Sequence, residues 1–159
     1  MMLQFITKNE LETFKLGRLL GEEAPAGLVV ALNGELGAGK TVFAQGVAAG
    51  LGISEQVTSP TFVLMQEYEG GRLPFCHIDA YRLEGDEVLA CGILESVNNK
   101  SLSVVEWAEN IAAYLPDDTV WVSIAVPFAE DVLLRKWQLS AEKGQEDFFK
   151  QIWREVVDL

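Results

Sequence analysis

Cysteine and histidine are scarce in this chain of 159 residues, which contains two cysteines and one histidine. Cys76 and Cys91 do not form a C-x-x-C pair, and the lone His77 offers little for a metal cluster, so no zinc site is predicted. We expect both thiols to be buried, because a free cysteine behaves as a small hydrophobic side chain. We expect His77 to be a hydrogen-bonded strand residue rather than a catalyst.

Positive charge is also scarce in this sequence. The chain has 12 lysines and arginines against 24 acidic residues, which gives a formal net charge of −12. Because neutralising phosphates requires a basic patch, this composition argues against a primary nucleic-acid binder. The acidic excess fits a partner with a basic surface, and it equally fits plain solubility.

Long apolar runs are missing as well. No run is long enough to span a bilayer, so no membrane association is expected. Residues 1–8 lack the apolar segment and cleavage site of a signal peptide, which predicts a cytoplasmic protein. With 49% hydrophobic and 23% charged residues, the chain has the composition of a folded globular protein, and its length predicts a single domain over residues 1–159.

What the chain does contain is a phosphate-binding motif of the form G-x-x-x-x-G-K-[ST]. Its residues are Gly34, Glu35, Leu36, Gly37, Ala38, Gly39, Lys40 and Thr41. The apolar run 27–32 predicts a buried strand before the motif, and residues 41–51 predict a helix after it that ends at Gly52. This arrangement forms an anion site, because backbone N–H groups and the helix dipole both favour negative charge.

The motif also predicts the roles of individual side chains. Its glycines let the backbone approach a phosphate closely, Lys40 reaches the β- and γ-phosphates, and the Thr41 hydroxyl contacts Mg²⁺. Such enzymes need a further acid at the end of a second strand. Asp79 and Glu106 both follow apolar strands, at the strand ends where ligands of open α/β sheets bind.

Glu106 follows the more uniformly apolar strand, so we assign it to Mg²⁺ and assign Asp79 to orienting the attacking water. Either acid can bind the ion directly or through water, and Asp79 alternatively caps the helix that follows it. The segment around Ser59 and Thr61 is either a switch that contacts the γ-phosphate or a structural loop. Arg82 and Arg135 either meet phosphates and nearby acids or form surface ion pairs.

The rest of the chain predicts alternating strands and helices. A capping box from Thr7 to Glu10 starts a first helix that Gly21 can end. Strands are expected at residues 3–6, 62–68, 73–78, 101–105, 120–126 and 132–139, and further helices at residues 83–94, 108–115 and 145–157. The predicted fold is a three-layer α/β domain of the P-loop NTPase type. Its central sheet is mixed and mostly parallel, with the hairpin 62–78 and a late antiparallel pair at its edges.

Four segments together resemble the TsaE family of bacterial P-loop ATPases, formerly called YjeE. They are residues 34–41, 58–62, 77–83 and 105–107. Ala80 and Glu35 depart from the residues usual in the family, at positions that need no chemistry. The resemblance implies an ATPase required to form N6-threonylcarbamoyladenosine at position 37 of tRNAs that read codons beginning with A. It further implies action with a TsaB–TsaD heterodimer, without transfer of the threonylcarbamoyl group by this chain.

The resemblance implies site residues by matching position. The catalytic set is Lys40, Asp79 and Glu106, with Thr41 and Glu106 at Mg²⁺. The ATP contacts that it implies beyond the loop are Thr13, Trp107 and Arg135, and the switch interpretation of residues 59–61 adds Thr61. Two alternatives remain, a small P-loop kinase, for which no arginine-rich lid is visible, and a non-catalytic nucleotide-gated assembly module. A GTPase is disfavoured because the chain has no N-K-x-D guanine signature.

Overall fold

The computed structural model describes residues 2–35, 37–60, 64–84, 86–87, 92–127 and 133–159. Its strands are β1 (Met2–Thr7), β2 (Val29–Gly34), β3 (Met65–Tyr68), β4 (Phe75–Asp79), β5 (Leu102–Glu106), β6 (Val120–Ala125) and β7 (Arg135–Ser140). Its helices are α1 (Glu10–Glu23), α2 (Lys40–Leu51), α4 (Ile93–Ser96), the 3-10 helix η1 (Ala108–Tyr114) and α5 (Lys143–Trp153).

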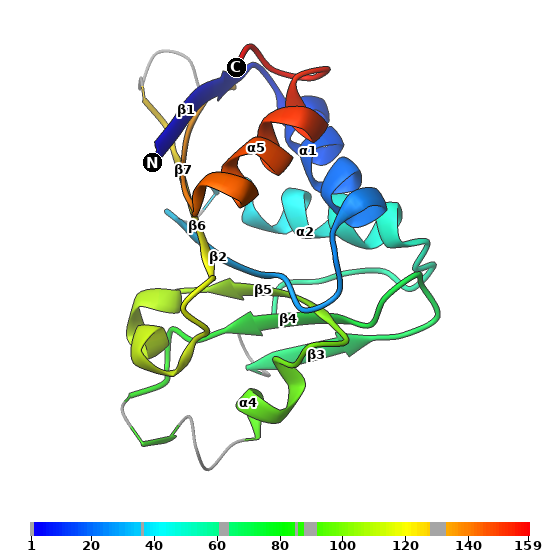
Figure 1. Ribbon diagram of the computed structural model, residues 1–159, viewed down its shortest axis with the longest axis vertical. Coiled ribbons are helices and arrows are strands. Elements are labelled where there is room, and N and C mark those ends of the chain that lie inside the picture. The colour runs from blue at the N-terminus through cyan, green and yellow to red at the C-terminus, as the bar shows by residue number, and fades with distance from the viewer. Residues whose placement is uncertain (1, 36, 61–63, 85, 88–91, 128–132) are drawn as a thin grey trace.

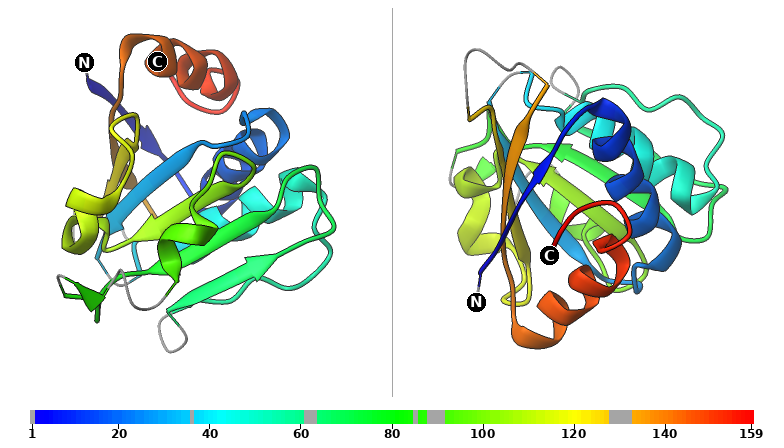
Figure 2. Two further views of the ribbon diagram at one scale, coloured as in Figure 1. Left: turned by 60° about the horizontal axis from the view of Figure 1, so that its bottom comes forward. Right: turned by 90° about the horizontal axis from the view of Figure 1, so that it is seen from above.

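The described strands form one seven-stranded sheet in the order β1-β7-β6-β2-β5-β4-β3. The central strands β6, β2, β5 and β4 are parallel, whereas β7, β1 and β3 join antiparallel at the two sides. Helices α1, α2 and α5 cover one face, and α4 and η1 lie on the other (Figures 1 and 2). The predicted three-layer α/β fold is confirmed, including the hairpin at one edge and the late antiparallel pair.

Helices α1 and α2 pack backbone against backbone. A Cβ added at Gly17, Gly21, Gly46 or Gly50 would come within 2.0 to 2.2 Å of a carbonyl oxygen of the facing helix. Glycine weakens an isolated helix, so its use here reflects the close approach of the two backbones. The contact brings the first turns of α1 beside the start of α2, where Thr13 Cγ2 lies 3.5 Å from the Cβ position of Gly39.

An aromatic core lies between the sheet and these helices. The rings of Phe5, Phe43, Trp137 and Trp153 pack with centroid separations of 5.5 to 6.4 Å. Both indole N–H groups are satisfied, Trp137 by Thr7 Oγ1 at 3.0 Å and Trp153 by a backbone carbonyl. Helix α5 therefore contributes to the same core as the first strand and the phosphate-loop helix.

The first helix begins differently from the prediction. Its N-cap is Asn9, whose side chain accepts from Glu12 N at 2.9 Å, and Glu12 in turn accepts from Lys8 N. The predicted cap, Thr7, is instead the last residue of β1, because strand pairing with β7 extends to it. The helix also continues past Gly21 to Glu23, since α2 packs directly on that glycine.

Other boundaries shift as well. A continuous helix over residues 83–94 is wrong, because Leu83 and Glu84 are not helical and Gly92 is left-handed, with φ +76°. Residues 85 and 88–91, including Cys91, lie outside the described residues. Cys76 is buried as expected, and burial raises its thiol pKa to about 12. None of the described helices is long and apolar enough to cross a membrane.

Candidate nucleotide-binding site

A cavity of about 560 Å³ opens beyond the carboxyl ends of β2, β4 and β5. Phosphate-loop residues, acids from two strand ends and two aromatic side chains meet there. Its lining residues are Glu10, Gly37, Gly39, Lys40, Thr41, Val42, Ser59, Asp79, Tyr81, Glu106 and Trp107.

The phosphate loop turns sharply between β2 and α2. Gly37 and Gly39 have φ of +82° and +111°, a left-handed region that other residues adopt only with strain. Gly34 serves packing, because a Cβ there would lie 2.9 Å from Ile124 O in the neighbouring strand. The start of α2 faces the cavity with Lys40 and Thr41, so its unpaired N–H groups and dipole favour an anion. Leu36 lies outside the described residues.

Lys40 is held on several sides. Its Nζ donates to Gly34 O at 2.7 Å, lies 3.6 Å from Glu106 Oε1 and lies 5.4 Å from the centroid of the Trp107 ring. The Lys40 side chain is only 11% exposed, so screening by solvent is reduced. The loop therefore carries a fixed positive charge beside a carboxylate.

The two predicted acids come together. Strands β4 and β5 run parallel, and Asp79 pairs with Glu106 in their register. Each residue is 4% exposed. Asp79 Oδ1 accepts from Tyr81 N at 2.9 Å, and Tyr81 and Arg82 form a turn, so among the described residues no helix starts directly after Asp79. Two buried carboxylates beside one lysine form an oxygen-rich site that suits a hard cation.

Trp107 adopts an unusual backbone conformation directly after Glu106. It has φ +56° and ψ +36°, the left-handed region that costs a non-glycine residue roughly 1–2 kcal/mol. Its ring packs on Tyr81 with a centroid separation of 4.9 Å. The turn that carries Tyr81 is held by Asn110, whose amide donates to Ala80 O and Tyr81 O. Strain and packing together place the indole beside Lys40.

Thr13 and Arg135 lie on the other side of the phosphate loop. They line a smaller cavity of about 260 Å³, together with Glu10, Gly37, Ala38, Gly39, Val42 and Leu133. Arg135 donates to Ala38 O at 2.9 Å and to Gly37 O at 3.2 Å. The arginine therefore holds the backbone of the loop in place, a contact that no local sequence pattern predicts. Four residues line both cavities, so the two cavities adjoin at the phosphate loop.

The remaining candidate residues are Ser59, Thr61, Glu35 and Arg82. Ser59 lines the main cavity, whereas Thr61 lies outside the described residues. Glu35 and Arg82 are exposed. Sequence reasoning missed Glu10 and Tyr81 as lining residues, and it missed the contact between His77 and Glu106. The spacing of His77 and Asp79 was an available signal, because residues two apart in a strand point to the same face.

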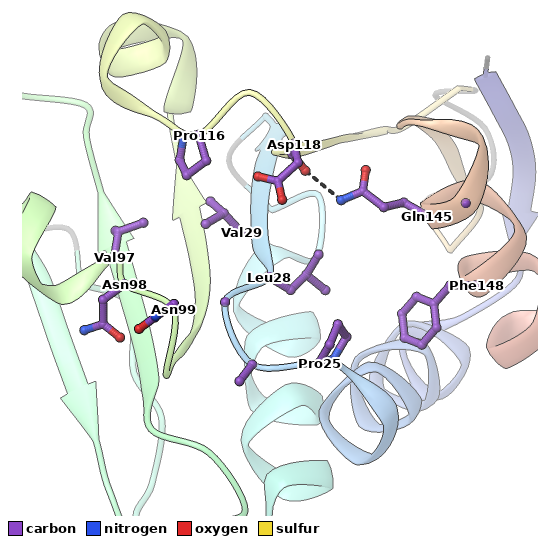
Figure 3. A pocket seen from close by; sticks show the side chains of 13 residues that line it. Pro25, Leu28, Val29, Val97, Asn98, Asn99, Pro116, Asp118, Gln145 and Phe148 are labelled. Carbon is purple, nitrogen blue, oxygen red and sulfur yellow. Dashed lines mark hydrogen bonds between the residues drawn. The ribbon is translucent and has the colours of Figure 1, made fainter.

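A second cavity of about 580 Å³ lies at the opposite end of the parallel strands (Figure 3). It is lined by Pro25, Ala26, Gly27, Leu28, Val29, Val97, Asn98, Asn99, Pro116, Asp118, Gly144, Gln145 and Phe148. Among the described residues Asp118 is its one charged lining residue, and Gln145 donates to the Asp118 backbone carbonyl at 2.7 Å. The charged groups that suit a nucleotide therefore gather at the other end of the sheet.

Known proteins resemble this chain over most of its length. The family model described as "Threonylcarbamoyl adenosine biosynthesis protein TsaE" matches residues 7–131. A relative from Treponema pallidum (strain Nichols) is 40% identical over 125 residues, or 78% of this chain and 92% of its own. One from Bacillus subtilis (strain 168) is 42% identical over 122 residues, or 77% of each chain. Both are named tRNA threonylcarbamoyladenosine biosynthesis protein TsaE.

The fold has a solved counterpart. The crystal structure of YdiB from Bacillus subtilis superposes with a TM-score of 0.78 and 30% sequence identity, covering 98% of this chain and 95% of that one. Sequence and structure thus agree beyond the phosphate motif, which many unrelated proteins share. On this agreement the chain belongs to the TsaE family and is a protein of the P-loop NTPase type.

Proposed function

We propose that this protein is a Mg²⁺-dependent ATPase required to form N6-threonylcarbamoyladenosine at position 37 of tRNAs reading codons that begin with A. The observation that carries the proposal is the register of Asp79 with Glu106, which sets two buried acids beside Lys40 and the phosphate loop. The relatives' names supply the pathway. In this proposal the chain hydrolyses ATP and does not itself transfer the threonylcarbamoyl group.

The residues present fit ATP and Mg²⁺. The loop and the start of α2 offer N–H groups to the phosphates, and hydroxyl and carboxylate oxygens are the donors that Mg²⁺ prefers. In the proposed site Thr41 and Glu106 hold the ion, which when bound neutralises charge on the β- and γ-phosphates. Thr13 and Arg135 adjoin the nucleotide from the smaller cavity. Thr61 lies outside the described residues and stays a predicted ATP contact.

The side chains of this protein divide the work of hydrolysis. Lys40 supplies positive charge to the transferred phosphate, where negative charge spreads in the transition state. Asp79 orients the attacking water through a carboxylate oxygen, since it lines the same cavity as the phosphate loop. Trp107 packs on Tyr81 and lies beside Lys40, so it places an apolar surface next to the lysine charge.

The partner in the proposal is the TsaB–TsaD heterodimer, in the cytoplasm. An acidic chain with a net charge of −12 suits a protein partner better than naked tRNA. We also propose that residues 1–159 act as one domain. Strand β1 pairs with β7, and Trp153 of the last helix packs on Phe5 of the first strand, so the two ends of the chain share one core.

Phosphate release and tRNA modification test the proposal together. We expect slow ATP hydrolysis by the protein alone, faster hydrolysis with purified TsaB–TsaD, and repeated rounds of modification only when all three are present. Asp79→Ala would abolish hydrolysis and repeated rounds alike. Full repeated modification with the hydrolysis-deficient Asp79→Ala protein would favour a nucleotide-gated assembly module. No hydrolysis by the wild type under any partner condition would reject an ATPase.

A further inference from the structure

His77 contacts the acid assigned to Mg²⁺. The histidine lies two residues before Asp79 in β4 and is fully buried. Its Nε2 is 2.7 Å from Glu106 Oε2, while Glu106 Oε1 is 3.6 Å from Lys40 Nζ. The two oxygens of one carboxylate therefore have different partners, and the carboxylate is held in one orientation.

The imidazole ring itself is fixed by packing. It stacks on Phe75 with a centroid separation of 5.9 Å and an interplanar angle of 11°. Phe75 stacks in turn on Tyr68, at 5.8 Å and 26°. Because these rings come from the paired strands β3 and β4, rotation of the imidazole would disturb the packing of both strands.

The surroundings of the ring also indicate where its proton lies. Within the described part of the chain, His77 Nδ1 is buried and has no hydrogen-bond partner. A buried N–H without an acceptor is strongly unfavourable, whereas a proton on Nε2 meets Glu106 Oε2 directly. The geometry therefore favours a proton on Nε2, which donates to the Glu106 carboxylate.

We propose that His77 is a positioning residue for Glu106, an inference that depends on the proposed function. Its Nε2–H holds Oε2, so that Oε1 is the oxygen presented to Mg²⁺ and to Lys40. Replacing a side chain that orients a metal-binding carboxylate typically lowers metal affinity or activity tenfold or more. Without this bond the carboxylate can rotate and offer both oxygens to Lys40.

One measurement tests the bond without any nucleotide. His77 is the single histidine of the chain, so ¹⁵N-histidine labelling gives one imidazole spectrum with no assignment problem. We expect nitrogen shifts of the Nε2–H tautomer, and we expect Glu106→Gln to move them. A spectrum of the Nδ1–H tautomer, or shifts that Glu106→Gln leaves unchanged, would overturn the inference.

A second measurement tests the consequence for the ion. Binding of a non-hydrolysable ATP analogue is titrated against Mg²⁺ by calorimetry for His77→Phe, which removes the donor, and His77→Gln, which supplies an amide N–H near the Nε2 position. We expect about a tenfold higher Mg²⁺ requirement for His77→Phe and substantial recovery for His77→Gln. Cys76→Ala is the matched control, because Cys76 precedes His77 in β4 and packs in the core on the other face of the sheet.

The outcomes separate this inference from the proposed function. Wild-type Mg²⁺ dependence in a folded His77→Phe protein would overturn the role of His77 alone. Absence of Mg²⁺-dependent binding by the wild type would overturn the proposed function and this inference with it. If His77→Phe fails to fold, the tautomer measurement and the His77→Gln titration still decide the question.

Discussion

The central sheet has a cavity at each end, of about 560 Å³ and about 580 Å³. Of the residues that the structure describes, Glu10, Lys40, Asp79 and Glu106 are the charged ones that line the first, and Asp118 is the single one that lines the second. Polar groups at the second end form hydrogen bonds with residues close to them in the sequence. Asn98, for example, donates to Glu95 O and accepts from Lys100 N. The two cavities therefore have similar volumes, and it is the charged side chains lining them that distinguish the two ends of the sheet.

The difference follows from strand direction. In parallel strands every carboxyl end lies at the same edge, so residues that follow β2, β4 and β5 converge there with the start of α2. At the opposite edge the chain enters the strands through turns. The backbone N–H and C=O groups of these turns form hydrogen bonds within the turns themselves and between them. Four predictions, ordered from the largest expected effect to the smallest, test this contrast.

Lys40→Ala is expected to have the largest effect. The variant removes the buried positive charge beside the phosphate loop, and we expect ATP hydrolysis to fall about 100- to 1,000-fold. Phosphate release measures it. Lys136→Ala, an exposed lysine of β7, is the matched control and should hydrolyse ATP at the wild-type rate. Equal rates for the two variants would show that the charge at this end of the sheet has no catalytic role.

Two glycines compare the tight contact between α1 and α2 with an open position at the second cavity. A Cβ at Gly46 would lie 2.2 Å from Phe14 O in α1, so we expect Gly46→Ala to lower the free energy of unfolding by about 1–3 kcal/mol. Gly144 lines the opposite cavity, and nothing lies within 4 Å of its Cβ position. Gly144→Ala should be neutral or stabilise the protein by up to about 1 kcal/mol. Urea denaturation gives both values, and a Gly46→Ala protein of wild-type stability would contradict the close helix contact.

Cys76 tests whether a buried ionisable group away from the charged end stays neutral. Burial, and secondarily the charge of Glu67, raises its pKa from 9.0 to about 12. The unfolded chain then loses the thiol proton near pH 9 while the folded chain keeps it. The free energy of unfolding should therefore fall between pH 9 and 12, by about 1.4 kcal/mol per pH unit. Cys76→Ala should remove this component from urea titrations at each pH, and an unchanged slope would be evidence against a neutral buried thiol.

Asn99→Ala should have the smallest effect. Asn99 is an exposed residue at the rim of the second cavity, far along the strands from the phosphate loop. We expect the affinity for an ATP analogue, measured by calorimetry, to change less than about twofold. A tenfold loss would mean that the two ends of the sheet are coupled and that nucleotide binding is not confined to the charged end.

The sequence alone predicted the features that have local signals. The phosphate motif, its flanking strand and helix and the strand ends at Asp79 and Glu106 are short-range patterns, and the structure brings them together. The cap at Thr7 was wrong because strand pairing with a distant segment decided the boundary. Residue roles at the site remain predictions, since they depend on ligands that bind there.

Features that depend on contacts between residues far apart in the chain could not be predicted from the sequence. A glycine in a helical pattern predicts a destabilised position or the end of the helix. Gly21 and Gly46 instead lie where the backbones of two helices touch. The bond between His77 and Glu106 joins residues 29 positions apart, which no local pattern reports. The bracing of the loop by Arg135 spans 97 positions.

The glycine contact between α1 and α2 has a mechanical consequence. Where side chains separate two helices, rotamer changes can absorb small shifts, but here the backbones meet with nothing between them. The two helices should therefore move as one rigid unit, in which neither helix slides or rotates without the other. Because α2 starts at Lys40 and α1 carries Thr13, any tilt of this unit moves both sides of the phosphate loop together.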